Sequence, residues 1–164
     1  MNETYKVQVQ DLVDDLKAVF THAGLGGEAG EYKLLTQSFL YKFLNDKFLY
    51  QAQVLDAGNT YENLFTMSEE DYDWLLEDIG TSTAWLKPDQ LIETLHRQQN
   101  EATFYETFEN TLNQIAIDNN DIFSVHTDGD TAIRLFDERL ITDTISDSSK
   151  RNEVAKAIIN LLAR

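Results

Sequence analysis

The segment from Glu31 to Tyr50 constrains the fold more than any other part of this sequence, because it is apolar on most sides of the helix that it predicts. It contains no glycine or proline, and its β-branched residues are limited to Thr36. Positions 32, 35, 39 and 43 form one stripe, and positions 34, 41 and 48 form a second. Such a helix is expected to be covered by other elements on several sides. Eleven of its twenty residues are large and apolar or aromatic: Tyr32, Leu34, Leu35, Phe39, Leu40, Tyr41, Phe43, Leu44, Phe48, Leu49 and Tyr50.

Helical periodicity in the rest of the chain predicts an all-α fold, an irregular helical bundle of about six to seven helices. Pro88 suits the first turn of a helix, where its missing N–H costs nothing. Residues 122–125 are partly β-branched and Asp128-Gly129 is a turn signal, so the pattern allows one short β-hairpin near 122–134. The predicted helices are 4–22, 30–56, 69–79, 89–98, 104–117, 131–140 and 152–163, with a short helical turn around 61–65.

Polar residues mark where three of these helices begin. In a capping box, a serine or threonine side chain accepts a hydrogen bond from a free backbone N–H of the first turn, and an acidic residue lies three positions later. The predicted caps are Ser68 with Asp71, Thr103 with Glu106, and either Ser148 or Ser149.

Length and composition fit an intracellular domain. The 164 residues suit one domain spanning 1–164, and 42% hydrophobic residues are ample for a core. The chain has no cysteine, which excludes disulfides and thiolate chemistry and favours a reducing compartment. No apolar run approaches the roughly 18 residues that a membrane-spanning helix needs. We therefore expect a cytoplasmic protein with no membrane partner.

The net charge of −16 opposes binding to duplex DNA, because affinity for phosphates comes mainly from lysine and arginine. The charge is uneven along the chain. Residues 48–86 hold eight acidic and no basic residues, whereas residues 134–164 hold six basic and five acidic ones. Contact with DNA is therefore expected only locally and with help from other chains.

The spacing of reactive residues disfavours catalytic and metal sites. The glycines from Gly24 to Gly27 follow a helix instead of a strand and lack the Gly-Lys-Ser/Thr ending of a phosphate loop. The three histidines, His22, His96 and His126, have no second ligand at metal-site spacing. The aspartates after residue 117 lack the order of a calcium loop, and no carboxylate pair stands out as acid and base. No catalytic, cofactor-binding or metal-binding residue is predicted.

Two groups of residues are better suited to contacts with other molecules. Aromatic residues between Tyr61 and Trp85 lie in the acidic segment, where the lack of cations favours core packing or subunit contact over stacking on bases. The best cationic cluster lies on the last predicted helix. A solvated face is its plainer interpretation, and a contact with DNA or a subunit is the alternative. This cluster consists of Lys150, Arg151 and Lys156.

Residues 31–48 read E-Y-K-L-L-x-x-x-F-L-Y-K-F-L-N-D-K-F. This segment resembles the N-terminal signature of type I restriction-modification DNA methyltransferase (modification) subunits. The flanks are similar to that family as well, with a Leu-rich helix before the segment and a small-residue connection at 23–30. Near the end, Lys150-Arg151-Asn152-Glu153 and the apolar helix around 146–163 resemble the place where such subunits finish their helical N-terminal domain.

The resemblance implies that the full subunit is an adenine-N6 DNA methyltransferase that uses S-adenosylmethionine and works with specificity and restriction subunits. It implies a non-catalytic role for this chain: packing on its own catalytic domain, contacting a second modification subunit and helping to close the complex around DNA. The family's Asn-Pro-Pro-Tyr/Phe motif is absent, because Pro88 is the single proline. The Gly-rich strand-turn-helix that holds the cofactor is absent too, so we expect no methylation by this chain alone and a catalytic domain that follows it.

Two other interpretations stay open. The acidic charge and the base-free segment 48–86 fit a stand-alone acidic binding protein, including a DNA mimic. A mimic should array carboxylates at phosphate-like spacing, however, and large aromatic residues interrupt the acids here. A small enzyme is the third interpretation, and no site in the sequence supports it.

Overall fold

The computed structural model describes residues 3–120, 125–126, 132–133 and 136–164 of the chain. It confirms the all-α bundle, because eight α-helices and one 3₁₀ turn account for most of these residues. No helix among them is both long and apolar enough to cross a bilayer. The elements are α1 (Glu3–His22), α2 (Ala29–Leu55), α3 (Tyr61–Thr66), α4 (Glu69–Ile79), η1 (Pro88–Gln90), α5 (Ile92–Arg97), α6 (Phe104–Asp118), β1 (Val125–His126), β2 (Ala132–Ile133), α8 (Leu140–Thr144) and α9 (Ser148–Leu162).

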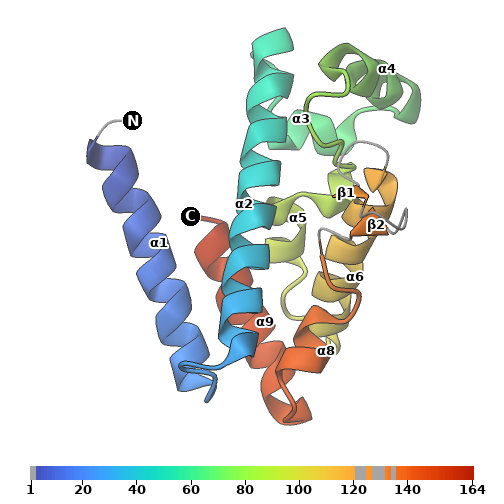
Figure 1. Ribbon diagram of the computed structural model, residues 1–164. Coiled ribbons are helices and arrows are strands. Elements are labelled where there is room, and N and C mark those ends of the chain that lie inside the picture. Colours follow the sequence, from blue (N-terminus) through green and yellow to red (C-terminus); the bar gives the residue numbers. More distant parts are fainter. Residues whose placement is uncertain (1–2, 121–124, 127–131, 134–135) are drawn as a thin grey trace.

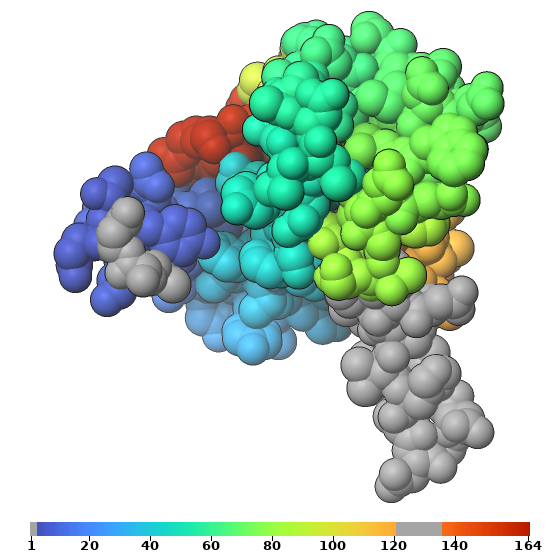
Figure 2. Space-filling view, turned by 90° about the horizontal axis from the view of Figure 1, so that it is seen from above, coloured from blue at the N-terminus to red at the C-terminus, as the bar shows by residue number. Residues whose placement is uncertain are grey.

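Helix α2 runs through the middle of the molecule. In Figure 1, α1 lies on one side of it, α5, α6 and α8 lie on the other, and α3 and α4 gather near its C-terminal end. Viewed from above, α1 and α4 lie at opposite sides of the molecule (Figure 2). The side of α2 that faces the core repeats at alternating steps of four and three residues, as a helix packed along one face requires. Its buried residues are Leu34, Ser38, Tyr41, Leu44, Asn45, Phe48 and Ala52.

The first four helices agree with the sequence prediction to within one or two residues at each end. The cap predicted for α4 is present: the Ser68 hydroxyl accepts a hydrogen bond from the Asp71 N–H at 3.2 Å. At the other end of α4, Gly80 has φ of 80°, a left-handed conformation that glycine adopts without a Cβ penalty. Local sequence signals were sufficient here because they do not compete with tertiary contacts.

The single helix predicted at 89–98 is wrong. The chain forms the turn η1 and then α5, with Leu91 extended between them (φ −72°, ψ 145°). Side chains of α2 satisfy the backbone at this break: the Tyr41 hydroxyl donates to the Gln90 backbone carbonyl at 2.6 Å, and the Asn45 side-chain amide oxygen accepts from the Ile92 N–H at 2.9 Å. These buried hydrogen bonds compensate for the helical ones that the break removes.

Two predicted caps are also corrected. Thr103 makes no capping hydrogen bond with its side chain. Instead Asn152 of α9 accepts from the Tyr105 N–H at 2.9 Å, so a residue almost fifty positions away caps α6. Helix α9 begins at Ser148, before the predicted 152, and its cap is Asp147, whose carboxylate accepts from the Ser149 N–H at 3.0 Å.

The helix predicted at 131–140 is wrong within the described residues. Ala132–Ile133 form a strand, residues 136–139 are not helical, and α8 begins only at Leu140. Phe136 is fully buried, and the Asp137 N–H donates to the Gln37 side chain at 2.9 Å, so tertiary contacts hold this stretch outside a helix. Of the β-hairpin expected near 122–134, the described part is an antiparallel pairing of β1 with β2, and the remainder lies outside the described residues.

Candidate docking groove

A groove with a volume of about 770 Å³ lies between α1 and α2. In Figure 1 the two helices are closest at the connection that joins them and diverge away from it, and the C-terminal end of α9 lies between them. We call this feature the α1–α2 groove. Its lining residues are Tyr5, Gln8, Val9, Asp11 and Leu12 of α1, Phe39, Lys42, Phe43, Asp46, Lys47 and Tyr50 of α2, and Leu161 and Arg164.

The groove is open because α1 is anchored at one end. Its buried residues are Leu16 and Phe20, both in its C-terminal half. Tyr5 and Val7, in the other half, are 50% and 54% exposed. Apolar burial is the main force that holds one helix against another. The half of α1 without buried residues therefore leaves the surface of α2 partly uncovered.

The two apolar stripes of α2 have different environments. The stripe at 34, 41 and 48 is buried, as expected. We expected the stripe at 32, 35, 39 and 43 to be covered as well. The structure differs, because Tyr32 is 71% and Phe43 is 52% exposed. About two turns beyond Phe43, Tyr50 adds a third exposed aromatic side chain on the same helix. Phe39, Phe43 and Tyr50 form the α2 wall of the groove.

Charged groups tie the base of the groove together. The Lys42 ammonium lies 3.2 Å from an Asp46 carboxylate oxygen and donates to the Arg164 carbonyl at 3.1 Å. The Arg164 guanidinium pairs with Asp15 of α1 at 2.7 Å. Arg164 thus links α1 and α2 through the end of α9. The Lys47 ammonium lies 5.9 Å from the centre of the Phe43 ring, where a cation is attracted by the π electrons.

The acidic segment forms a separate surface on α4. Four carboxylates surround Trp74, which is 61% exposed. The other aromatic residues of this region divide between core and surface: Tyr72 is buried, whereas Phe65 is half exposed. Trp85 donates its ring N–H to the Gly80 carbonyl at 2.7 Å. This hydrogen bond holds the ring against the loop that follows α4. The four carboxylates are those of Glu69, Glu70, Asp73 and Glu77.

The three cations predicted as a DNA or subunit contact do not share one face of α9. Lys150, Arg151 and Lys156 are separated by about 100° or more around the helix axis, at about 3.6 residues per turn. Lys150 is exposed and lines a pocket together with Val19 and His22 of α1. Lys156 is partly buried on another side of the helix. A joint contact by all three with one flat surface is therefore disfavoured, and single contacts stay predictions.

Arg151 has a structural environment that the sequence did not indicate. Its guanidinium donates to the Ile145 carbonyl at 2.9 Å and to the Thr142 carbonyl at 3.4 Å. It also lies 5.8 Å from the centre of the Tyr105 ring. These carbonyls belong to the end of α8 and the residue after it, where an arginine complements free carbonyl groups and the negative end of the helix dipole. Arg151 connects α8, α9 and α6.

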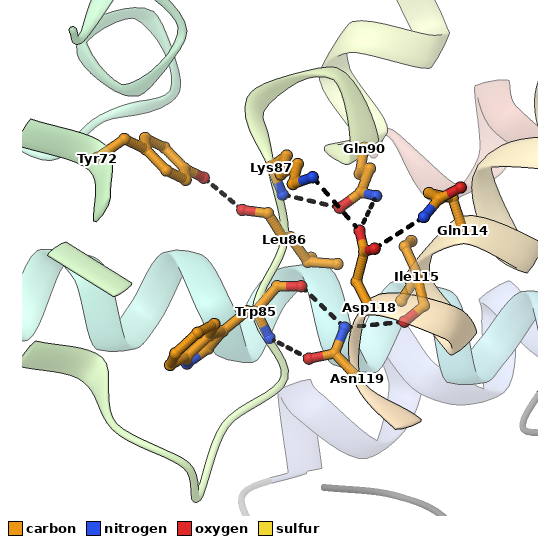
Figure 3. A network of polar contacts seen from close by, with 9 residues as sticks. All are labelled: Tyr72, Trp85, Leu86, Lys87, Gln90, Gln114, Ile115, Asp118 and Asn119. Carbon is orange, nitrogen blue, oxygen red and sulfur yellow. Dashed lines mark hydrogen bonds and ion pairs between the residues drawn. The ribbon is translucent and has the colours of Figure 1, made fainter. Parts of the chain in front are cut away.

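A network of polar contacts surrounds the extended segment before η1 (Figure 3). Asn119 pairs with the backbone of Trp85 twice, accepting at 2.7 Å and donating at 2.9 Å. Tyr72 donates to the Leu86 carbonyl, and Gln90 bridges the Lys87 N–H and the Asp118 carboxylate. Every side chain drawn is engaged by another part of the chain. The network therefore holds a loop against α6 and offers no free group for chemistry.

The remaining sequence candidates show no grouping for chemistry. His22 is exposed at the end of α1, and a ring nitrogen of His96 is 2.9 Å from the Asn160 side chain. The side chain of His126 lies outside the described part of the chain. Gly24 and Gly27 have φ of 87° and 79° in the loop between α1 and α2, which explains why glycine is needed there. In the described ranges, no three His, Asp or Glu side chains are grouped to hold a metal.

Comparison with known proteins finds no matching protein-family model, no matching curated protein and no matching solved structure. Sequence reasoning did not single out the α1–α2 groove. Its one available signal was the apolar character of most sides of α2, which predicted that other elements cover this helix on several sides.

Proposed function

We propose that this chain is a non-catalytic assembly domain, and that it is the helical N-terminal domain of a type I restriction-modification DNA methyltransferase subunit. The observation that carries this proposal is the exposed apolar stripe of α2, because the same helix carries the resemblance at 31–48. Phe43 and Tyr50 are exposed on one side of a helix whose other side is fully buried. Aromatic residues gathered on an open groove are typical of protein–protein contact surfaces.

The packing of the helices supports the resemblance. Residues 31–48 belong to α2 and residues 146–163 belong largely to α9, and these two helices contact each other. The two segments with family-like sequence thus form one structural unit. Arg164, at the end of this unit, is linked to both α1 and α2, so residues that follow it in a longer polypeptide would start beside the groove.

The proposed role assigns the chemistry to other parts of a complex. The catalytic domain of the same subunit would bind S-adenosylmethionine and methylate adenine at N6. Specificity and restriction subunits would complete the cytoplasmic complex, and DNA would be reached through that complex. With a net charge of −16, this chain contributes protein contacts far more readily than phosphate contacts.

The reading frame downstream of Arg164 gives the first test. We expect a Gly-rich S-adenosylmethionine loop after a strand, followed by Asn-Pro-Pro-Tyr or Asn-Pro-Pro-Phe. A stop codon directly after Arg164 would contradict the proposal.

The second test is biochemical: the full subunit should transfer labelled methyl groups to adenine in DNA in the presence of its specificity subunit. The same subunit without residues 1–164 should lose stable complex formation, measured by light scattering after gel filtration.

A stand-alone acidic binding protein is the second candidate, and the α4 surface favours it. Four carboxylates surround an exposed Trp74 in a segment, 48–86, that has no basic residue. Such a surface suits a basic protein partner. The chain would then inhibit a DNA-binding enzyme in competition with DNA, and it would do so without any methyltransferase subunit present. Inhibition that disappears in a Glu70→Gln, Asp73→Asn double variant would support this candidate over the assembly domain.

A further inference from the structure

We propose that the α1–α2 groove binds one amphipathic helix of a partner protein, with carboxylates flanking the apolar stripe of that helix. This inference rests on the proposed assembly role and names the chemistry of the partner segment. It goes beyond the resemblance, which gives no docking element.

The shape of the groove suits a helix. Its walls are themselves helices, α1 and α2, and its α2 wall extends from Phe39 to Tyr50. At about 1.5 Å per residue, this wall is about 17 Å long, or about three helical turns. A diverging pair of helices leaves a channel that a third helix fills by interdigitating its side chains with both walls. Extended peptides gain most from a sheet edge, and the walls of this groove are helical.

The side chains of the groove suit an apolar stripe. Tyr5, Phe43 and Tyr50 stand at its walls and are half or more exposed, while Val9, Leu12 and Leu161 are partly buried beneath them. Helices that dock in grooves use apolar residues at i, i+3 or i+4, and i+7. Burying aromatic side chains against such residues removes exposed apolar area of α2 from water.

The charged residues that line the groove indicate which residues should flank the apolar stripe of the partner helix. The chain has 29 acidic and 13 basic residues, yet three cations and two carboxylates line the groove, namely Lys42, Lys47, Arg164, Asp11 and Asp46. Two of the three cations are already paired, Lys42 with Asp46 and Arg164 with Asp15. Lys47 lies over Phe43 and donates to the Ser82 carbonyl at 3.4 Å, and it pairs with no carboxylate in the described part of the chain. A carboxylate beside the apolar stripe would therefore meet the ammonium group of Lys47, the lining cation on the α2 wall that no carboxylate of the described residues compensates.

The test uses the purified chain and two fluorescent peptides of about twelve residues, which form about three turns. Both carry leucines at i, i+3 or i+4, and i+7; one has glutamates beside the stripe and the other has lysines at the same positions. Binding is measured by fluorescence anisotropy at low and at physiological salt. The glutamate peptide should bind about tenfold or more tightly than the lysine peptide at low salt. Equal or tighter binding of the lysine peptide would overturn the proposal.

A pair of tyrosines on the same helix gives a matched control. Tyr50 lines the groove and Tyr32 does not, although both are highly exposed at 66% and 71%. Tyr50→Ala should weaken binding of the glutamate peptide about tenfold or more, as the loss of a large aromatic contact at an interface does, and Tyr32→Ala should leave it unchanged. Circular dichroism of both variants should equal that of the wild type, since neither side chain is in the core. Equal effects of both substitutions on binding would contradict the assignment of the site.

Charge reversal and self-association complete the test. Lys47→Glu should remove the preference for the glutamate peptide. Gel filtration of the chain alone tests a second copy as the occupant: a dimer that Tyr50→Ala dissociates would assign the groove to self-association and overturn the proposal.

The peptide assay needs no methyltransferase subunit. Loss of peptide binding would therefore refute this inference alone, whereas a stop codon after Arg164 would refute the proposed family alone.

Discussion

Glu109 of α6 accepts a hydrogen bond at 3.0 Å from the backbone N–H of Ile141, near the start of α8. The same carboxylate accepts the Thr142 N–H at 3.0 Å and the Thr142 hydroxyl at 2.8 Å. Glu109 is 5% exposed. The first N–H groups of a helix have no intrahelical partner, so a buried carboxylate from another helix completes the start of α8 and fixes it on α6.

Glu109→Gln should lower the free energy of unfolding by about 1–3 kcal/mol, because hydrogen bonds to a charged acceptor are lost and buried N–H groups lose their best partner. Urea unfolding followed by circular dichroism measures this change. Glu153→Gln, at an exposed position of α9, is the control and should change stability by less than about 0.5 kcal/mol. A Glu109→Gln variant as stable as the control would contradict the capping role.

The two candidate caps of α6 can be separated by parallel substitutions. Asn152→Ala should lower the free energy of unfolding by about 1–2 kcal/mol, as the removal of a helix cap does. Its side chain also donates to the Ala102 carbonyl at 2.6 Å, and this bond is lost as well. Thr103→Ala should be nearly neutral, because the Thr103 side chain caps nothing. Thermal melts of both variants test this order, and a larger loss for Thr103→Ala would reverse the assignment.

The cations of α9 should separate into a structural and a surface residue. Arg151→Ala should lower the free energy of unfolding by about 1–2 kcal/mol, since its guanidinium donates to two carbonyls at the end of α8. Lys150→Ala, at an exposed neighbouring position, should leave stability unchanged. In the proposed complex with a methyltransferase domain, a defect in assembly or DNA engagement caused by Lys150→Ala would show a direct contact. A defect seen with Arg151→Ala alone, together with a lower melting temperature, would show an indirect effect of stability.

Alkaline pH should destabilise the protein through two buried tyrosines. Burial, and then the charge of Asp89, raises the pKa of Tyr41 and of Tyr72 above the ordinary value of 10.0. A raised pKa in the folded state means that both phenols contribute full stability below pH 10 and lose it as the pH rises further. The free energy of unfolding should then fall by up to about 1.4 kcal/mol per pH unit for each tyrosine.

Tyr41→Phe checks this pH dependence. Its slope of stability against pH, measured by urea unfolding between about pH 9 and 11, should be shallower than that of the wild type, because one linked proton is removed. Tyr50→Phe is the control, since Tyr50 is 66% exposed, and it should keep the slope of the wild type. Identical slopes for Tyr41→Phe and the wild type would show that this phenol stays protonated or is not linked to folding.

Some elements of the fold could be predicted because their signals are local. The apolar repeat of α1, the length of α2 and the Ser68 cap of α4 depend on residues within a few positions of one another. The break at Leu91, the late start of α8 at Leu140 and the Asn152 cap could not be predicted in this way. In each case a side chain distant in sequence satisfies the backbone, such as Asn45 for the Ile92 N–H, and no local pattern records such a partner.

Helices around a strongly apolar central one could be predicted from local patterns, because periodicity and caps act over a few residues. Which stripe of α2 is buried depends on how the helices pack against one another. Position 48 lies in the core and position 43 is 52% exposed, although both are phenylalanine. The difference arises because Leu16 and Phe20 anchor one half of α1 and leave its other half away from α2. Composition does not encode that divergence, and the divergence creates the groove.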